Sequence, residues 1–288
     1  MRKVTLPVRQ WKAIAKDAFA LIVEQYYRLA MRQLRRRGNA PMRRRPVIVS
    51  LSTTPKRLSH KTDVAIATLL MQKLRPDRVI LWISDTIQNQ PLSKTYHDLI
   101  DAGLEVKYRK DVGPHTKLLY ALQEYPDCVI VSADDDIFYP AAWLGDLYTS
   151  YERAPQLIHA HRAHLMHKDT GGKLASYNEW QHLAPGMVGP SHMLFPTGVG
   201  GVLYPPNSLA REVFNVEAFR RLCPMQDDVW FKAMALLQGT MCKKVKGHWR
   251  HFPLIHGSQE ESLYATNIKR NDEQMHATFG EYDLYRLL

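Results

Sequence analysis

The chain of 288 residues is 45% hydrophobic and 23% charged, which excludes the disordered, collagen-like and disulfide-scaffold classes and fits one large globular domain or two small ones. Its net charge of +11 is concentrated at one end, because residues 1–45 hold 13 Lys and Arg against only Asp17 and Glu24. The other 243 residues hold 26 basic and 26 acidic side chains. A basic N-terminal segment is therefore attached to a neutral body, and the two need separate explanations.

Cysteine usage and the lack of long apolar runs indicate the compartment. The three cysteines are an odd number without C-x-x-C spacing, which argues against a disulfide framework and a structural zinc site and favours a reducing cytoplasm. The longest uncharged stretch of the N-terminal segment, residues 18–23, is far below the roughly 20 apolar residues of a spanning helix. It is also too short for a signal-peptide core. We therefore expect a protein that is neither exported by that route nor threaded through a bilayer.

The first elements in chain order are one long helix and then a strand-helix alternation. Residues 8–37 lack Pro and Gly and carry apolar residues at helical spacing, which predicts an amphipathic helix, stopped by Gly38 and followed by a linker over 39–46. We therefore expect a helix and linker in residues 1–45 and one folded domain in residues 46–288. In that domain the pattern predicts strands at 47–52, 78–84, 104–109 and 128–133, alternating with helices at 61–74, 93–102, 116–124 and 141–153.

This alternation predicts an α/β fold with a mostly parallel sheet covered by helices on both faces. Beyond Leu157 the pattern changes to a strand at 158–166, a Gly/Pro-rich stretch at 168–206, a helix starting at Asp227 and a polar C-terminal portion. In an open α/β sheet the ligand crevice lies at the carboxyl ends of the strands. Residues just past each strand are therefore the ones to consider for chemistry.

Three adjacent carboxylates, Asp134-Asp135-Asp136, follow the predicted strand at 128–133. They repel one another near neutral pH, and a hard divalent cation would hold them together. A solvated acidic loop is the plain alternative. A haloacid-dehalogenase-type phosphatase is disfavoured, because Phe138 stands where that D-x-D element has Thr or Val, and because the triplet follows the fourth strand.

Glycine-rich nucleotide loops are missing from the sequence. There is no G-x-x-x-x-G-K-[ST], and Gly198-Val199-Gly200-Gly201 does not complete G-x-G-x-x-G. Metal and side chains would therefore have to neutralise the phosphates of any bound nucleotide diphosphate.

Two strand-end segments offer hydroxyls and cations to such a ligand. Residues 113–117 pass from the third strand into a helix, with Thr116 as a plausible N-cap and Lys117 in the first turn. Free amides and a Lys at a helix N-terminus suit phosphate oxygens, although an ordinary capped helix with an exposed Lys fits equally well. Residues 52–57 lie in the same crevice. Each segment alone is weak evidence.

Two further clusters of ionisable residues have more than one interpretation. Asp227-Asp228 open a helix, with Trp230 close by, so they fit both an N-cap and a carboxylate base beside a sugar-binding face. Four histidines between residues 159 and 167 include three that would share one face of a straight strand, His159, His161 and His167, while His164 points to the other. Zinc ligation is possible there, but polar lining of a cleft is the preferred interpretation.

Seven segments between Pro46 and Asn271 together resemble one family: 47–55, 113–118, 129–140, 161–164, 177–180, 196–206 and 223–235. The order and content of these segments resemble bacterial glycosyltransferases of the GT-A fold, of the kind that assembles capsule, O-antigen and other surface polysaccharides. The resemblance implies a GT-A-like domain with a Rossmann-type, mostly parallel central sheet. It leaves residues 1–45 outside.

The resemblance also implies an activity and a cofactor. The implied reaction is metal-dependent transfer of a sugar from a nucleotide-diphosphate donor to a glycan acceptor. Asp136 would bind Mn²⁺ or Mg²⁺, which offsets charge on the departing diphosphate, with His256 as a further ligand and His251 as the runner-up. The implied donor-binding residues are Thr53, Thr54, Arg57, Lys117, Asp134 and Asp135.

Asp227 and Asp228 resemble the acidic pair that supplies the base in inverting members of the family. Such a base removes the proton of the acceptor hydroxyl. We favour Asp228 for this role.

Two other function classes compete with the transferase. One is nucleic-acid binding through the Arg-rich segment, which the neutral body opposes; the other is a phosphoryl-transfer or hydrolytic enzyme that uses the Asp cluster. The partners we expect are a nucleotide sugar and a glycan or lipid-linked glycan, and no nucleic acid.

The basic amphipathic helix predicts contact between residues 1–45 and an anionic membrane surface. This contact would hold the protein on the inner face of the cytoplasmic membrane. Packing of the helix on its own domain, and a coiled coil with a partner chain, are the alternatives.

Overall fold

The computed structural model describes the chain except for residues 1–20, 28, 31–42, 59–61, 248–250 and 256–263, and for residues 264–270 it describes the backbone only. The strands are β1 (Val47–Ser52), β2 (Arg78–Ser84), β3 (Leu104–Arg109), β4 (Val129–Ser132), β5 (Ile158–Ala160), β6 (Ala163–Leu165), β7 (Leu194–Pro196), β8 (Val202–Tyr204) and β9 (Cys242–Lys244). The α-helices are α2 (Pro55–Leu58), α3 (Thr62–Leu70), α4 (Lys94–Asp101), α5 (Thr116–Glu124), α6 (Trp143–Arg153), α7 (Val216–Leu222), α8 (Asp227–Leu237) and α9 (Tyr264–Glu281).

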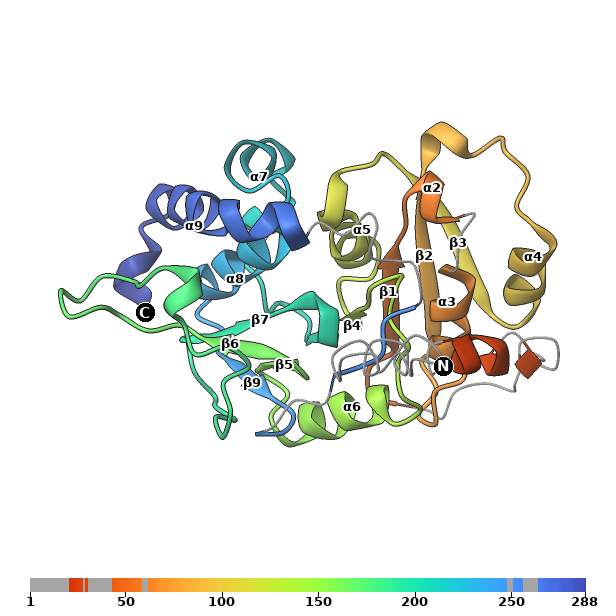
Figure 1. The fold of residues 1–288 in the computed structure, drawn as a ribbon, viewed down its shortest axis with the longest axis horizontal. Coiled ribbons are helices and arrows are strands. Elements are labelled where there is room, and N and C mark those ends of the chain that lie inside the picture. The colour runs from red at the N-terminus through yellow and green to blue at the C-terminus, as the bar shows by residue number, and fades with distance from the viewer. Residues whose placement is uncertain (1–20, 28, 31–42, 59–61, 248–250, 256–263) are drawn as a thin grey trace, which may run out of the picture.

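A seven-stranded sheet in the order β3-β2-β1-β4-β8-β5-β9 forms the centre of the fold (Figure 1). β1 to β4 are mutually parallel, β5 pairs in parallel with β9, and β8 lies antiparallel between β4 and β5. A separate two-stranded sheet joins β6 and β7. The expected fold class is confirmed: an α/β, Rossmann-type, mostly parallel sheet with helices on both faces.

The two faces of the sheet follow from the alternation of side chains along each strand. In β1, Val47, Val49 and Leu51 belong to the core under α3, α4 and α6, whereas Ile48 belongs to the core on the α5 and α8 side. Figure 1 shows this arrangement with the strands nearly edge-on, α5 on one side and α3 and α4 on the other. Because helices cover both faces of the sheet, its parallel strands are continuous apolar runs in the sequence.

The first half matches the predicted elements closely, and the second half differs. The strands at 47–52, 78–84 and 104–109 and the helix at 116–124 have the predicted bounds. The strand expected at 158–166 is broken at residues 161–162 into β5 and β6, which belong to different sheets. The short elements β7, β8, β9 and α7, and the long helix α9, were not predicted.

Two helix starts differ from the sequence expectation. Thr116 is not the N-cap of α5: the cap is His115, and the Thr116 hydroxyl instead accepts a hydrogen bond from the Val112 N–H at 3.2 Å. At α8 the N-cap is Gln226, so Asp227 and Asp228 lie in the first turn of the helix. Their carboxylates are therefore free for other contacts and still benefit from the helix dipole.

The predicted N-terminal helix is described only in part. Residues 21–27 and 29–30 are helical and are called the N-terminal helix below, while the rest of the predicted helix and its stop at Gly38 lie outside the described residues. Among the helices that the structure describes, none has the length and apolar character needed to cross a membrane.

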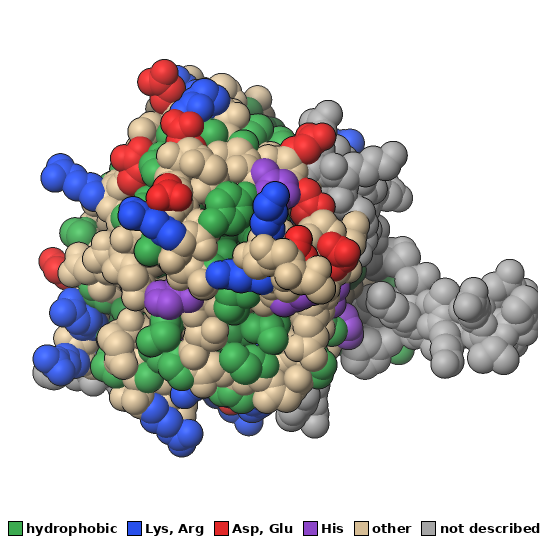
Figure 2. All heavy atoms as spheres, turned by 90° about the vertical axis from the view of Figure 1, so that its left-hand side faces the viewer, with side chains coloured by type: hydrophobic (Ala, Val, Ile, Leu, Met, Phe, Trp, Pro, Cys, Tyr) green, Lys and Arg blue, Asp and Glu red, His purple; other side chains and the backbone are tan. Residues whose placement is uncertain are grey.

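Charges on the folded body are mixed in sign. Figure 2 shows one face of the molecule, on which Lys and Arg side chains are interspersed with Asp and Glu. This agrees with the balance of 26 basic and 26 acidic residues after residue 45.

Candidate functional site

Lys117 connects the two acidic clusters noted in the sequence, the triplet at 134–136 and the pair at 227–228. Its Nζ lies 2.8 Å from Asp134 Oδ1 and 3.0 Å from Asp227 Oδ2. Asp134 follows β4 and Asp227 opens α8, so the fold brings together residues 93 positions apart at the carboxyl end of the parallel strands. This is where an open α/β sheet binds its ligand.

Lys117 is a buried cation held by carboxylates. Its side chain is 12% exposed. Burial lowers the pKa of Lys117, but the charges of Asp134, Asp227 and Asp228 outweigh it, and the pKa stands well above the ordinary value. Lys117 is therefore a fixed positive charge at the centre of the cluster, not the exposed Lys of an ordinary capped helix.

Asp228 is held by the glycine-rich loop. The backbone N–H of Gly198 donates to Asp228 Oδ1 at 3.0 Å and to Oδ2 at 3.2 Å. Burial, and then the adjacent charge of Asp227, raise the pKa of Asp228. This carboxyl group is positioned by a backbone donor and has a higher proton affinity than an exposed Asp.

A side chain at Gly198 would make tight contacts with two residues of the cluster. A Cβ there would lie 3.0 Å from Lys117 Nζ and 3.3 Å from Asp228 Oδ1. The loop is anchored further on by Trp143, whose Nε1–H donates to the Gly200 carbonyl at 2.8 Å. In the sequence this loop stands out as an incomplete nucleotide motif and as part of the matching segment 196–206, and its three glycines are the signal for a close backbone approach.

The other two carboxylates of the triplet face the segment after β1. Asp135 accepts hydrogen bonds from Arg57 and from the Thr53 hydroxyl, both at 2.6 Å, and the other terminal nitrogen of Arg57 lies 3.5 Å from Asp136. Burial, and then the charges of Asp134 and Asp135, raise the pKa of Asp136 to about 7. Burial and the two neighbouring carboxylates therefore disfavour the ionised form of Asp136.

The triplet loop is held by hydrogen bonds on both sides. The Asp134 N–H donates to the Tyr139 hydroxyl at 2.7 Å, the Phe138 N–H donates to the Pro253 carbonyl, and the Ile255 N–H donates to the Asp136 carbonyl, the last two both at 2.9 Å. The C-terminal segment thus pairs with the loop one residue before position 256. His256 lies outside the described residues, and His251 is exposed.

Thr54 differs from the other described members of the predicted site in its exposure. Its hydroxyl accepts from the Arg57 N–H at 3.2 Å, at the start of α2, and its side chain is exposed. Thr53, Arg57, Lys117 and the acidic residues lie together, but their roles stay predictions.

The histidines of the 159–167 run have separate structural partners. His159 is within 2.9 Å of the Ser150 hydroxyl, His161 is within 2.9 Å of the Trp143 carbonyl, and His164 Nδ1 accepts from the Leu183 N–H. All three are between 0% and 8% exposed. They therefore belong to the core and do not line a cleft, and the break between β5 and β6 keeps them from converging on a zinc ion.

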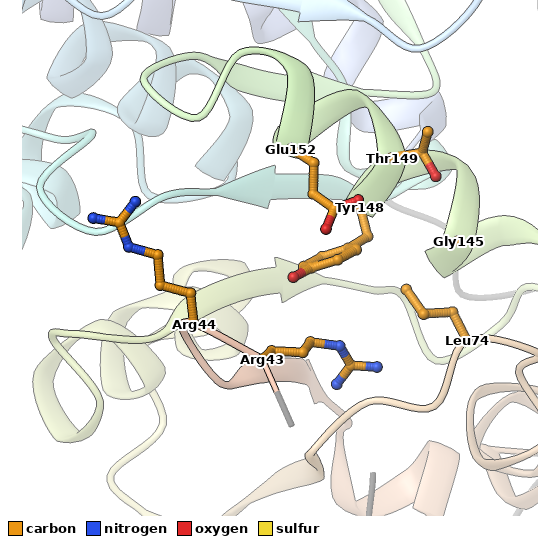
Figure 3. Close-up of a pocket in the computed structure, with 7 residues that line it drawn as sticks. All are labelled: Arg43, Arg44, Leu74, Gly145, Tyr148, Thr149 and Glu152. Atoms are coloured by element: carbon orange, nitrogen blue, oxygen red, sulfur yellow. The ribbon is translucent and has the colours of Figure 1, made fainter. Parts of the chain in front are cut away.

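A hollow of about 450 Å³ lies away from the cluster of Asp134, Asp135, Asp136, Asp227 and Asp228. Its lining includes Arg43, Arg44, Tyr148 and Glu152 (Figure 3). The Arg43 guanidinium lies 5.4 Å from the centre of the Tyr148 ring and pairs with Asp77 at 2.7 Å. Since the same Asp77 oxygen accepts from the first N–H of β1, this hollow lies at the opposite, amino end of the sheet.

Comparisons with known proteins find similarity in structure at low sequence identity. No family model matches the chain, and no curated protein sequence matches it significantly. The chain is similar in structure to the mannosyltransferase PcManGT from Pyrobaculum calidifontis in complex with GDP-Man and Mn²⁺, with 17% identity, a TM-score of 0.49, and coverage of 93% of this chain and 74% of that one.

Two other solved structures are similar to this chain at lower TM-scores. One is S. aureus TarS 1–349, with 12% identity, a TM-score of 0.44, and coverage of 69% of this chain and 57% of that one. The other is a CMP:2-keto-3-deoxy-manno-octonic acid synthetase complexed with CTP, with 10% identity, a TM-score of 0.40, and coverage of 69% and 88%. Likeness at this level assigns no activity to this chain.

Proposed function

We propose that this chain is a metal-dependent glycosyltransferase that moves a sugar from a nucleotide-diphosphate donor to a glycan hydroxyl. The observation that carries the proposal is the contact of Lys117 with both Asp134 and Asp227. This contact joins two groups of carboxylates. The loop that holds Asp134 suits a divalent cation, which in turn attracts phosphate, and the pair Asp227 and Asp228 suits proton transfer. Both lie at the carboxyl edge of an open α/β sheet, where ligands bind.

The acidic cluster fits a divalent cation by charge. Five carboxylates, Asp134 to Asp136 with Asp227 and Asp228, share Lys117 and Arg57. The described residues include no group of three or more His, Cys, Asp or Glu that could hold a metal ion by themselves. We propose that Asp136 binds Mn²⁺ or Mg²⁺ together with the donor phosphates, and that Asp134 contacts the donor. His256 is the proposed further protein ligand. Once bound, the metal offsets charge on the departing diphosphate.

The cations of the cluster suit a donor diphosphate. Lys117 lies at the start of α5, where free amides and the helix dipole favour anions. We propose that Lys117 contacts the diphosphate and that Arg57, with Thr53, Thr54 and Asp135, holds the nucleoside part. Arg57 and Lys117 would then exchange part of their carboxylate contacts for contacts with the donor.

Asp228 is the proposed base. The acceptor oxygen forms a bond to the anomeric carbon as the bond from that carbon to the diphosphate breaks, and the electron pair leaves with the diphosphate. The acceptor proton goes to an Asp228 carboxylate oxygen. Its raised pKa suits a base that works near neutral pH, and attack from the face opposite the leaving group inverts the anomeric configuration. Asp227 keeps Lys117 in place.

The acceptor and the location complete the proposal. We propose a glycan or lipid-linked glycan acceptor in bacterial surface-polysaccharide synthesis, with the protein peripheral on the inner face of the cytoplasmic membrane. The 13 basic residues among residues 1–45 support attraction to an anionic leaflet. The balance of 26 basic and 26 acidic residues after residue 45, with mixed signs on the face seen in Figure 2, gives no support to nucleic-acid binding.

The deciding experiment is a ligand screen on the purified full-length chain. We expect thermal stabilisation by a nucleoside diphosphate with Mn²⁺, no stabilisation by an oligonucleotide, and turnover of one sugar nucleotide with release of nucleoside diphosphate. Stabilisation by oligonucleotide alone would reject the transferase. Release of inorganic phosphate from a phosphate ester would favour the phosphoryl-transfer alternative, and release of pyrophosphate from a nucleoside triphosphate would indicate a nucleotidyltransferase.

A further inference from the structure

The N-terminal helix has two different apolar faces. Its inner face packs on the folded domain, where Val23 and Tyr27 join a small core with Val64, Phe138 and Ile255. The ring of Tyr27 stacks on that of Phe138 with centroids 6.0 Å apart and planes 21° apart. Packing on the protein's own domain was one alternative for this segment, and the structure shows it for this face alone.

The outer stripe is formed by Leu21, Ile22, Tyr26 and Leu29. Their exposed fractions are 45%, 68%, 61% and 60%. Three of them follow the i, i+4, i+7 spacing of one helix side, so the stripe is continuous. Among the described residues the other exposed large hydrophobic side chains are Ile100 and Leu287, each 37% exposed and each alone in its part of the sequence.

The charge of the surrounding segment indicates what covers the stripe. Residues 1–45 hold 13 Lys and Arg against Asp17 and Glu24, and Glu24 is only 6% exposed, on the inner side of the helix. Two copies of this chain meeting through the stripe would bring two such segments of like charge together. An anionic lipid surface instead attracts the cations and accepts apolar and aromatic side chains at its interface.

We propose that the outer stripe inserts into the interface of an anionic membrane while the inner face stays packed on Phe138. Phe138 lies two residues after Asp136, and a helix with its side chains is about 10 Å across. The acidic loop is therefore held about one helix diameter from the lipid surface, by a packed contact and not by a loose tether. The membrane contact does not depend on the chemistry proposed for the site. Its use in bringing the site close to a lipid-linked acceptor rests on that proposed function.

The test is vesicle co-sedimentation of the full chain with two matched double variants. Ile22→Gln with Leu29→Gln removes apolar surface from the stripe without changing charge, and Ile100→Gln with Leu287→Gln does the same elsewhere. With vesicles of phosphatidylglycerol and phosphatidylcholine in equal parts, we expect the stripe variant to bind at least about tenfold more weakly than wild type. The control variant should bind as wild type does, and pure phosphatidylcholine vesicles should bind little of any form.

Three results would overturn the inference: wild-type protein that stays in solution with anionic vesicles, a stripe variant that sediments as wild type does, or a wild-type dimer that only the stripe variant dissociates. The last result would assign the stripe to a second copy of the chain. Equal melting temperatures of the two variants exclude a folding defect as the cause of lost binding. Stabilisation by nucleoside diphosphate and Mn²⁺, measured on the same samples, reports on the proposed transferase separately, so either idea can fail alone.

Discussion

The Gly198 N–H donates to both carboxylate oxygens of Asp228, at 3.0 and 3.2 Å. This contact joins the loop before β8 to the first turn of α8, and a side chain at residue 198 would crowd Asp228 and Lys117. A Cβ there would approach Lys117 Nζ to 3.0 Å. The glycine therefore sets the spacing between the proposed base and the central cation.

Gly198→Ala is expected to reduce transfer at least tenfold while costing little stability. The added methyl group displaces Lys117 or Asp228, and small displacements of reacting groups lower the reaction rate strongly. The matched control is Gly280→Ala in α9, where a Cβ would meet nothing within 4 Å, so activity should not change. Initial rates and melting temperatures of both variants check this. Full activity of Gly198→Ala would show that the contact does not matter for the reaction.

Asp136→Ala is expected to abolish transfer and metal-dependent nucleotide binding and to leave the fold intact. The substitution removes a carboxylate whose pKa burial and its acidic neighbours raise to about 7, so it relieves repulsion. Nucleotide titration with and without Mn²⁺ measures the effect, with Asp101→Asn, an exposed residue of α4, as the control. Undiminished metal-dependent activity would refute the metal assignment.

Asp228→Asn is expected to remove transfer and keep donor binding. The amide oxygen of Asn still accepts from the Gly198 N–H, so the loop stays in place, but an amide cannot take the acceptor proton. Isothermal titration with the donor and a rate assay separate the two effects. A parallel loss of donor affinity would place Asp228 in the donor site, and a product with retained anomeric configuration would contradict the base role.

Tyr27→Ala is expected to lower the free energy of unfolding by about 1–2 kcal/mol, since it removes a stacked, half-buried ring from Phe138. Because Phe138 belongs to the acidic loop, metal-dependent nucleotide affinity should fall as well. Chemical unfolding and nucleotide titration measure the two effects, and Ile22→Ala on the outer stripe, at a side chain that is 68% exposed, is the control that should change neither. Equal nucleotide affinity in both variants would show that the helix does not support the loop.

Stability is expected to fall as the pH drops from about 6.5 to about 4, in part through His161. Burial lowers the pKa of this imidazole from 6.5 to about 4, so in that window the unfolded chain binds the proton and the folded chain does not. For a shift of this size the contribution is about 3 kcal/mol. His161→Gln should flatten the dependence of the melting temperature on pH, whereas substitution of the exposed His97 should not. An unchanged slope in His161→Gln would contradict this assignment.

The parallel half of the sheet could be predicted from the sequence alone, and the residues proposed for the site were also chosen from the sequence. The strands at 47–52, 78–84 and 104–109 are recognisable because strands buried on both faces are apolar throughout. The Asp triplet could be found because it directly follows such a strand. The separation of a basic segment from a neutral body is also visible in the sequence alone.

Tertiary structure decided which of these residues meet. The three-residue strands β7, β8 and β9 are too short for any periodic pattern, and they exist only because distant strands pair with them. The contact of Lys117 with Asp134 and Asp227, and the donation from Gly198 to Asp228, are likewise long-range. The two faces of the N-terminal helix show the same limit. Its pattern predicted an amphipathic helix, but only the position of Phe138 decides that Tyr27 is covered and Tyr26 exposed, because burial depends on what packs against a side chain and not on the side chain itself.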